Sequence, residues 1–265
     1  MIFRRLRRAV ALGFALAACA FRFWLIRVRG PLSLEQRALW LQSASRGVLA
    51  SLGIHTRVEG RIPAQGLVVS NHLSYLDIVI LSAAMPCFFV SKVEVKRWPF
   101  FGWAARTGGT IFLDRSSRSS ANRVAAQITE RLTSSMPVLL FPEGTSTDGR
   151  ELLPFRSRLF LPAVQAQAPV TAAAVRYVLE EGAQERDLCW YGDAPFLPHL
   201  WKVLGSSGFS AQIRFGQPQV YVDVRGAAQE AQNAVAAMRA TESRVAAQVR
   251  AESRAGVLAG FNARG

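Results

Sequence analysis

Cysteine is scarce in this chain of 265 residues, which contains only Cys19, Cys87 and Cys189. The three are isolated and odd in number, and no CxxC pair is present. This pattern argues against a disulfide framework and a cysteine zinc site, and it fits a reducing compartment. The histidines are also only three, at positions 55, 72 and 199, and they are too scattered to indicate a metal cluster.

Several nucleophile and nucleotide motifs are missing as well. No G-x-S-x-G elbow is present and no cysteine has a nucleophilic context, so catalysis through a covalent intermediate is not expected. Gly144 and Gly149 have the spacing of a phosphate loop, but Arg150 and Glu151 stand where Lys and Ser or Thr are required. We therefore expect neither a nucleotide P-loop nor a metal or redox cofactor.

Acidic residues are few, with 18 Asp and Glu against 32 Lys and Arg, which leaves a net charge of +14. Such an excess indicates a polyanionic partner: an anionic membrane, a phosphorylated substrate or a nucleic acid. Arginine far outnumbers lysine, which suits bidentate phosphate contacts, although an Ala- and Arg-rich composition accounts for the surface arginines equally well. Because no basic-aromatic module is recognisable, nucleic acid is not an expected partner.

The sequence does contain short apolar segments that alternate with helical ones, and half of its residues are apolar. This alternation predicts an α/β fold with a largely parallel sheet flanked by helices. The predicted strands are residues 67–70, 87–90, 110–113, 137–141 and 169–178. The predicted helical segments are residues 74–84, 98–103 and 119–132.

Composition divides the chain into three predicted parts. Residues 1–55 are predicted to form a pair of membrane-associating helices, and residues 56–225 form the α/β domain. Residues 226–265 form a helical tail rich in Ala, Arg, Glu and Gln, with a surface helix over about residues 226–257.

The first helix begins with four arginines and continues as an apolar run from Ala9 to Phe21, which Arg22 interrupts. Such a run spans only about 20 Å as a helix, short of a bilayer core of roughly 30 Å. With residues 23–26 it nearly reaches across, and Arg22 then lies near one end, where it can extend to the headgroups.

Three interpretations of this helix compete. It is a membrane anchor with its arginines on the anionic cytoplasmic leaflet, a secretory signal, or a buried core helix. Ala18-Cys19-Ala20 resembles a cleavage site, but arginines and bulky apolar residues continue past it. The sequence therefore favours the anchor.

The second helix is predicted to begin after Ser33, because Ser33 and Gln36 have capping-box spacing. Apolar residues then recur at helical spacing: Leu34, Ala38, Leu41, Ala44, Val48 and Leu52. This stripe either packs on the domain or lies in the membrane interface.

Polar residues follow three of the predicted strands, at Asn71–Asp77, Asp114–Arg115 and Pro142–Thr147. Open α/β sheets place their sites at the carboxyl ends of strands, so these stretches are expected to share one crevice. Histidine takes or gives a proton near neutral pH, and a carboxylate at Asp77 would orient His72. The pair would then activate a substrate hydroxyl directly. The alternative is structural, with Asp77 capping the helix from Ser74 and His72 a loop residue.

Together these stretches resemble the glycerolipid acyltransferase family, typified by 1-acylglycerol-3-phosphate acyltransferase. The family block NHxSxxD is matched by residues 71–77, and G-x-I-F-(I/V)-D-R is matched by residues 109–115. The block F-P-E-G-T is matched by residues 141–145, and the last block resembles Ala168-Pro-Val170. The order and spacing agree over about residues 68–175.

The resemblance implies acyl transfer from acyl-CoA or an acyl carrier protein to the hydroxyl of a lyso-lipid. In that mechanism His72 is the general base and Asp77 its partner, and backbone N–H groups after Ser74 stabilise the oxyanion or hold a phosphate. The expected substrate-binding residues are Asn71, Ser74, Arg115, Glu143, Gly144 and Thr145. Since acyl thioesters are cytosolic, the membrane-associated enzyme is expected to face the cytoplasm.

The acceptor expected first is 1-acylglycerol-3-phosphate, which would give phosphatidic acid. However, Ser146 stands where many of these enzymes have an arginine, and residues 143–149 and 153–157 look closer to the branch that includes lyso-ornithine lipid acyltransferases. Lyso-ornithine lipid or another lysophospholipid is therefore the alternative acceptor. Two further alternatives are a hydrolase that uses His72 on water and a non-enzymatic basic membrane-binding protein.

Overall fold

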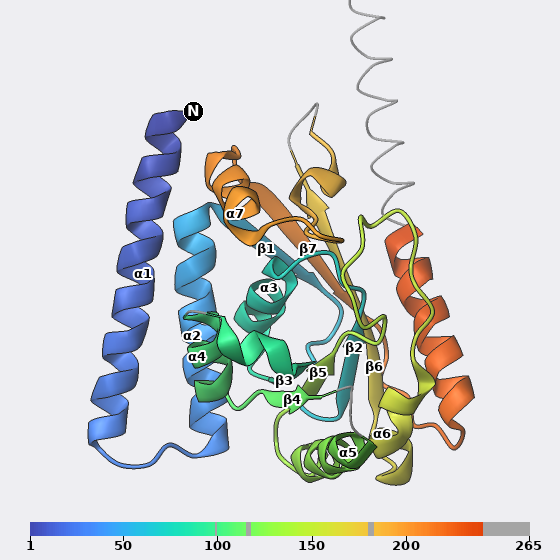
Figure 1. Cartoon of the computed structure of the whole chain (residues 1–265). Coiled ribbons are helices and arrows are strands. Elements are labelled where there is room, and N and C mark those ends of the chain that lie inside the picture. The colour runs from blue at the N-terminus through green and yellow to red at the C-terminus, as the bar shows by residue number, and fades with distance from the viewer. Residues whose placement is uncertain (99, 115–117, 180–182, 241–265) are drawn as a thin grey trace, which may run out of the picture.

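The computed structural model describes residues 1–98, 100–114, 118–179 and 183–240 (Figure 1). Its centre is a seven-stranded sheet with the strand order β1-β7-β6-β2-β5-β3-β4. The strands are β1 (Ile54–Glu59), β2 (Leu67–Ser70), β3 (Phe88–Lys92), β4 (Ile111–Leu113), β5 (Val138–Leu140), β6 (Val170–Val178) and β7 (Phe209–Phe215).

The sheet is largely parallel, as the sequence predicted. Among the described strands, five pairings are parallel and one, between β6 and β7, is antiparallel. The two strands β1 and β7 were not among the predicted strands. They pair with each other in parallel and add to the far side of β6.

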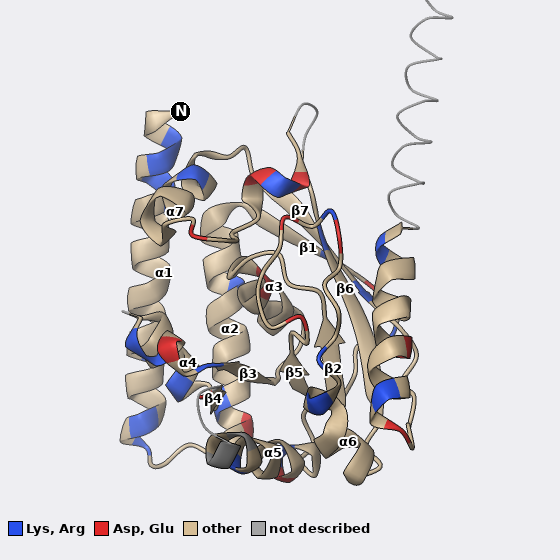
Figure 2. Cartoon of the chain, turned by 45° about the vertical axis from the view of Figure 1, so that its right-hand side comes forward, with Lys and Arg blue, Asp and Glu red and all other residues tan. Residues whose placement is uncertain are grey.

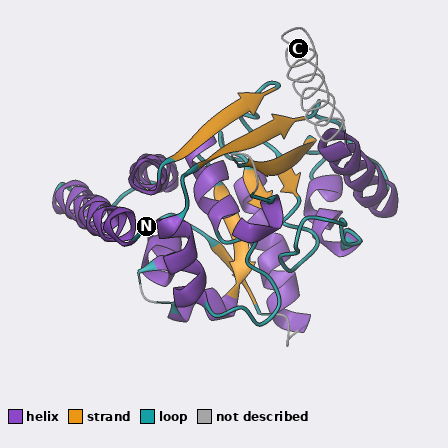
Figure 3. Ribbon diagram, turned by 90° about the horizontal axis from the view of Figure 1, so that it is seen from above, coloured by secondary structure: helices purple, strands orange, loops and turns teal. Residues whose placement is uncertain are grey.

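Helices cover both faces of the sheet (Figure 3). They are α1 (Ile2–Val28), α2 (Leu34–Leu52), α3 (Leu76–Ala84), α4 (Phe101–Thr107), α5 (Arg118–Leu132), α6 (Leu161–Gln165) and α7 (Phe196–Gly205), with a C-terminal helical segment at residues 224–240. Three short 3-10 turns lie at Val93–Arg97, Ser157–Phe160 and Glu185–Leu188.

Two apolar cores follow from the alternation of side chains along the strands. Val68 on β2 faces the core shared with α2, α3 and α7, whereas Leu67 and Val69 face the core shared with α5, α6 and the C-terminal helical segment. Because β2 is buried on both faces, its sequence is a continuous apolar run instead of an alternating one.

The C-terminal helical segment packs on the sheet with a narrow apolar face, which includes Ala227, Ala231 and Val235, all nearly inaccessible to solvent. The predicted tail helix is therefore present up to residue 240, and it belongs to the second core. The rest of that prediction lies outside the described residues, and the division into three domains stays a prediction.

The second helix begins as predicted. The Ser33 hydroxyl accepts a hydrogen bond from the Gln36 N–H, and the Gln36 side chain accepts one from the Ser33 N–H, which completes the capping box. Ala38 and Leu52 of the predicted stripe are buried, so this helix packs on the domain. The sequence analysis did not include Trp40, whose indole is buried and donates to the carbonyl of Cys19 on α1 at 3.2 Å.

The first helix is long and apolar enough to cross a membrane, and only 6% of its most apolar window is buried within the fold. The interpretation of α1 as a core helix is therefore wrong. Its partner along its length is α2, and its two buried residues are Arg8 and Cys19.

Two of the N-terminal arginines bind the end of α7 instead of pointing into solvent. Arg4 donates to the Gly205 carbonyl at 2.6 Å, and Arg8 donates to the carbonyls of Ser206 at 2.6 Å and Ser207 at 3.3 Å. Helix C-termini leave carbonyls unpaired and carry partial negative charge, so guanidinium groups stabilise them. These contacts fasten the N-terminal end of α1 to the fold.

Gly53, which ends α2, is required by this packing. Its φ of +68° is a left-handed conformation that favours glycine. A Cβ at this position would also lie 2.3 Å from Nη2 of Arg8, so any side chain would displace the guanidinium.

Replacing Arg8 with Ala should lower the free energy of unfolding by about 1–3 kcal/mol, because partly buried carbonyls just after α7 lose a charged donor. Thermal unfolding in detergent measures the change. Arg7→Ala is the matched control, since Arg7 is the exposed neighbouring residue. Equal effects of the two substitutions would contradict the role of Arg8.

Candidate active site

The loops that follow β2 and β5 meet at one edge of the sheet. The two strands are parallel neighbours, so their carboxyl ends lie side by side. The backbone N–H of Thr147, after β5, donates to the carbonyl of His72, after β2, at 2.9 Å. The predicted convergence of these two stretches is therefore present. Arg115, in the stretch predicted after residues 110–113, lies outside the described residues.

His72 and Asp77 are in direct contact. Nδ1 of His72 lies 2.9 Å from Oδ2 of Asp77. The Asp77 side chain is fully buried, whereas the His72 side chain is 18% exposed. The imidazole therefore contacts a buried carboxylate through one nitrogen and retains access to solvent.

Asp77 also receives hydrogen bonds from the chain around it. Its Oδ2 accepts from the N–H groups of Leu73 at 2.6 Å and Ser74 at 2.9 Å. The carboxylate thus caps the helix start, as the structural alternative in the sequence analysis expected. The Ser74 hydroxyl accepts instead from the N–H of Leu76, where α3 begins.

Two N–H groups after Ser74 are already engaged within the helix start. Leu76 donates to Ser74 Oγ, and Asp77 donates to the Ser74 carbonyl at 3.0 Å. The expectation that N–H groups after Ser74 stabilise an oxyanion or hold a phosphate is therefore wrong for these two groups.

Tyr177, which the sequence analysis missed, completes the surroundings of Asp77. Its hydroxyl donates to Oδ1 of Asp77 from β6. Burial and the Asp77 carboxylate raise the pKa of Tyr177 well above its ordinary value, so the hydroxyl keeps its proton and remains a donor. The strand was predicted, but the pairing of β6 with β2 decides which of its residues faces Asp77.

The ring of His72 stacks on the ring of Phe141, with centroids 4.1 Å apart and planes 13° apart. The carboxylate of Glu143 holds the same histidine by its backbone. Oε1 accepts from the N–H of His72 at 2.7 Å, and Oε2 accepts from the N–H of Leu153 at 2.9 Å. Both the side chain and the backbone of His72 are therefore held by buried carboxylates.

Glu143 is 3% exposed, and this burial raises its pKa above the ordinary value. The two backbone donors, from Leu153 and His72, act in the opposite direction because they stabilise the ionised form. Desolvation is the larger effect, so the ionised carboxylate costs the folded state free energy.

Four other predicted site residues lie in these loops, Asn71 and Ser74 after β2 and Gly144 and Thr145 after β5. Asn71 and Ser74 are buried, and the Asn71 amide exchanges two hydrogen bonds with the backbone of Val175 on β6, at 3.0 and 2.8 Å. Gly144 is buried in a turn with φ of +78°, and Thr145 beside it is exposed. Of these four, Thr145 is the one that solvent reaches.

Trp190, to which the sequence analysis gave no role, connects the loop after β2 with the loop after β5. The Ser146 hydroxyl donates to the carbonyl of Trp190 at 2.5 Å, and the Trp190 N–H donates to the carbonyl of Leu73 at 2.9 Å. Ser146 therefore uses its hydroxyl within the fold.

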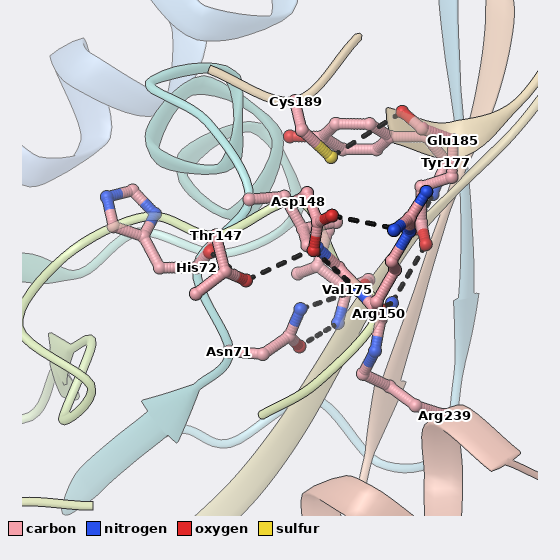
Figure 4. Close-up of polar contacts among 12 residues, drawn as sticks. Asn71, His72, Thr147, Asp148, Arg150, Val175, Tyr177, Glu185, Cys189 and Arg239 are labelled. Atoms are coloured by element: carbon pink, nitrogen blue, oxygen red, sulfur yellow. Dashed lines mark hydrogen bonds and ion pairs between the residues drawn. The ribbon is translucent and has the colours of Figure 1, made fainter. Parts of the chain in front are cut away.

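Arg239 is a second residue that the sequence analysis missed. From the C-terminal helical segment, its guanidinium donates to the carbonyls of Val175 at 2.5 Å and Gly149 at 2.8 Å, and it pairs with Glu185 at 2.8 Å. Figure 4 shows this network on one side of Asn71, with the His72 ring pointing away from it. The network supports β6 at the point where Asn71 contacts it.

Comparison with known proteins agrees with this geometry. An Acyltransferase family model matches residues 55–176, which include His72, Asp77 and Glu143. A lyso-ornithine lipid O-acyltransferase from Rhodobacter capsulatus is 42% identical over 180 residues, which cover 64% of this chain and 63% of that protein. A lyso-ornithine lipid O-acyltransferase from Pseudomonas aeruginosa is 36% identical over 222 residues, which cover 81% of this chain and 82% of that protein.

A 1-acyl-sn-glycerol-3-phosphate acyltransferase from Neisseria meningitidis is 34% identical over 184 residues, which cover 68% of this chain and 72% of that protein. The crystal structure of the 1-acyl-sn-glycerophosphate acyltransferase PlsC from Thermotoga maritima has the same fold, with a TM-score of 0.67 at 17% identity over 91% of this chain and 95% of that chain. With these relatives and this shared fold, the chain belongs to the glycerolipid acyltransferase family that its motifs indicated.

Proposed function

We propose that this acyltransferase moves an acyl group from a thioester, acyl-CoA or an acyl carrier protein, to the hydroxyl of a lyso-lipid, with His72 as general base. The observation that carries the proposal is the contact between Nδ1 of His72 and buried Asp77. Asp77 already accepts from two N–H groups and a tyrosine hydroxyl, so it meets His72 as a fourth donor. Nδ1 then carries the proton, and Nε2 is free to act as the base.

In the proposed step, Nε2 of His72 takes the proton of the acceptor hydroxyl while the hydroxyl oxygen forms a bond to the thioester carbonyl carbon. The carbon–sulfur bond then breaks, and the proton passes from His72 to the departing thiolate. Asp77 keeps the imidazole oriented and stabilises its charged form during transfer. Stacking on Phe141 fixes the plane of the ring.

Most of the other predicted site residues act by positioning in this proposal. Glu143 places the backbone of His72, and Asn71 and Ser74 place the loop between β2 and α3. Buried Gly144 forms the turn after Glu143, and the exposed Thr145 hydroxyl next to it is the polar group that contacts the acceptor. Arg115 stays a predicted ligand of the anionic head.

Lyso-ornithine lipid is the acceptor that we place first, ahead of 1-acylglycerol-3-phosphate. Two relatives, 42% and 36% identical, are named lyso-ornithine lipid O-acyltransferase. Ser146 stands where many enzymes that act on a phosphate-bearing acceptor have an arginine, and its hydroxyl is hydrogen-bonded to the carbonyl of Trp190. The order expected from the sequence was the reverse, and the relative from Neisseria meningitidis keeps 1-acylglycerol-3-phosphate as the second candidate.

We also propose that α1 holds the enzyme at a membrane, where lyso-lipids reside, with the catalytic domain facing the cytoplasm. The helix is apolar and mostly exposed, and it remains attached to the fold through Arg4, Arg8 and Cys19. Such contacts fit a retained helix better than a cleaved signal.

Detergent-solubilised enzyme supplied with labelled acyl-CoA should form a head-group-dependent lipid product, first with lyso-ornithine lipid and then with lysophosphatidic acid, as read by mass. Product only from lysophosphatidic acid would reverse the order of acceptors. Release of free fatty acid without any acylated lipid would identify a hydrolase instead.

His72→Ala should lower the rate of product formation by about a hundredfold to ten-thousandfold, the usual contribution of a general base. His55→Ala is the matched control, because His55 is exposed on β1. An unchanged rate in a folded His72→Ala enzyme would remove His72 as the base.

Tyr177→Phe should lower kcat on the order of tenfold, because Asp77 loses a buried donor worth about 1–3 kcal/mol and holds His72 less firmly. Tyr191→Phe provides the control, since Tyr191 is 43% exposed. Steady-state kinetics of both variants make the comparison, and equal kcat values would contradict the role of the Tyr177 hydroxyl.

Glu143→Gln should change how stability depends on pH. The folded-state pKa of Glu143 is raised, so its contribution to stability is greatest below the ordinary glutamate range and declines as pH rises through the raised pKa. The variant lacks this titration, so its stability deficit should be larger at acidic than at neutral pH in thermal unfolding. Glu151→Gln, an exposed change in the same loop region, should show no such difference.

A further inference from the structure

Exposed apolar side chains extend from α1 onto α7. On α7, Leu197 is 72% exposed and Trp201 is 43% exposed, and their spacing of four residues places them on one side of the helix. On α1, Leu6, Val10 and Phe14 are 53%, 59% and 72% exposed and follow the same spacing. We call these five residues the α1–α7 face.

The two halves of this face are joined by direct contacts. The Arg5 guanidinium lies over the Trp201 ring, 5.4 Å from its centroid, and Arg4 bonds to the last residue of α7. One turn before Arg5 and Leu6 on α1 lie Met1 and Ile2, which are apolar and 84% and 69% exposed. The α7 residues therefore adjoin the exposed surface of the helix proposed to hold the enzyme at the membrane.

We propose that α7 is a second membrane-contacting element beside α1, and that Leu197 and Trp201 enter the interface of an anionic bilayer together with the exposed side of α1. The proposal rests on the membrane association of α1 under Proposed function. An apolar patch bordered by cationic groups is the pattern that binds such an interface, and a tryptophan with one edge apolar and one polar suits the headgroup level.

The charges around the face match this occupant. Arg5, Arg7 and Lys202 border it. Lys202 is 56% exposed on α7 next to Trp201 and pairs with Asp187 at 3.4 Å. Figure 2 shows Lys and Arg gathered at the N-terminal end of α1 beside α7. Cationic side chains near an anionic leaflet are attracted to its surface.

The position of α7 gives this contact a function. The opposite side of α7 is buried. On that side, Nδ1 of His199 lies 3.1 Å from the hydroxyl of Tyr75, the residue that precedes α3. Asp77 lies two residues after Tyr75. A bilayer that touches the outer side of α7 is thus separated from the start of α3 by about the 10 Å thickness of one helix, which brings a lyso-lipid close to His72.

The same face has a competing occupant, an acidic acyl carrier protein, because it combines apolar and basic groups. The α1–α7 face extends along α1 for more than two helical turns beyond Trp201, and this continuity with the proposed membrane helix favours the bilayer.

The test places a fluorescent probe on single introduced cysteines in the full chain, since Cys19, Cys87 and Cys189 are buried. The variants are Leu197→Cys, Phe14→Cys as the α1 reference, and Val222→Cys, an 88% exposed apolar site before the C-terminal helical segment. Each is reconstituted with vesicles of equal phosphatidylglycerol and phosphatidylcholine that carry a nitroxide quencher on the lipid chain. We expect quenching at positions 14 and 197 and none at 222.

If the probe at position 14 is quenched and the probe at position 197 is as little quenched as the one at 222, the proposal is overturned and α1 is the sole anchor. Absence of quenching at both 14 and 197 would overturn it together with the membrane role of α1. Acyl transfer to detergent-dispersed acceptor, measured on the same samples, tests the proposed activity separately.

A second experiment needs no label. Leu197→Ser/Trp201→Ser should lower acyl transfer to vesicle-embedded lyso-lipid severalfold and leave transfer to detergent-dispersed lyso-lipid unchanged, with Val220→Ser/Val222→Ser as the matched exposed control. Equal losses in both assays would show a structural defect and overturn the proposal. A loss seen with an acyl carrier protein donor but not with acyl-CoA would assign the face to the carrier protein.

Discussion

The buried carboxylate of Asp77 is the constraint on which the site depends. An ionised carboxylate without solvent is costly unless every lone pair is engaged, and here four donors surround it: two loop N–H groups, the Tyr177 hydroxyl and His72. Those donors come from the loop after β2 and from β6. The start of α3, the pairing of β6 with β2 and the orientation of the imidazole are therefore coupled through one charged group.

Glu143 extends this coupling to the second strand of the site. It holds the backbone of His72, while Asp77 holds the ring, so the histidine is constrained at both ends. The negative charge of Asp77 adds to burial in raising the pKa of Glu143. The arrangement places two buried carboxylates around one histidine, and backbone N–H donors offset part of the free energy that burying these charges costs.

The periphery of the molecule connects to this centre through α7. Arg4 and Arg8 of α1 bind its C-terminal end, and His199 on its inner side contacts Tyr75 beside α3. Trp190, in the segment that leads into α7, holds the loops after β2 and β5 by its backbone. A helix at the outer surface of the fold is thus linked by short contacts to the loop that carries His72.

The sequence by itself determined the parallel α/β core and the pair His72 and Asp77, because these are encoded locally, by apolar runs of strand length and by a polar motif directly after a strand. Tertiary structure alone decided that Tyr177 and Arg239 serve the site, since each contact joins positions far apart in the chain and depends on strand order and helix packing. It also decided that the carboxylate of Glu143 faces backbone N–H groups and that arginines of α1 bind α7. A charged residue in a sequence shows its charge, but its partner depends on which segments the fold brings within hydrogen-bonding distance.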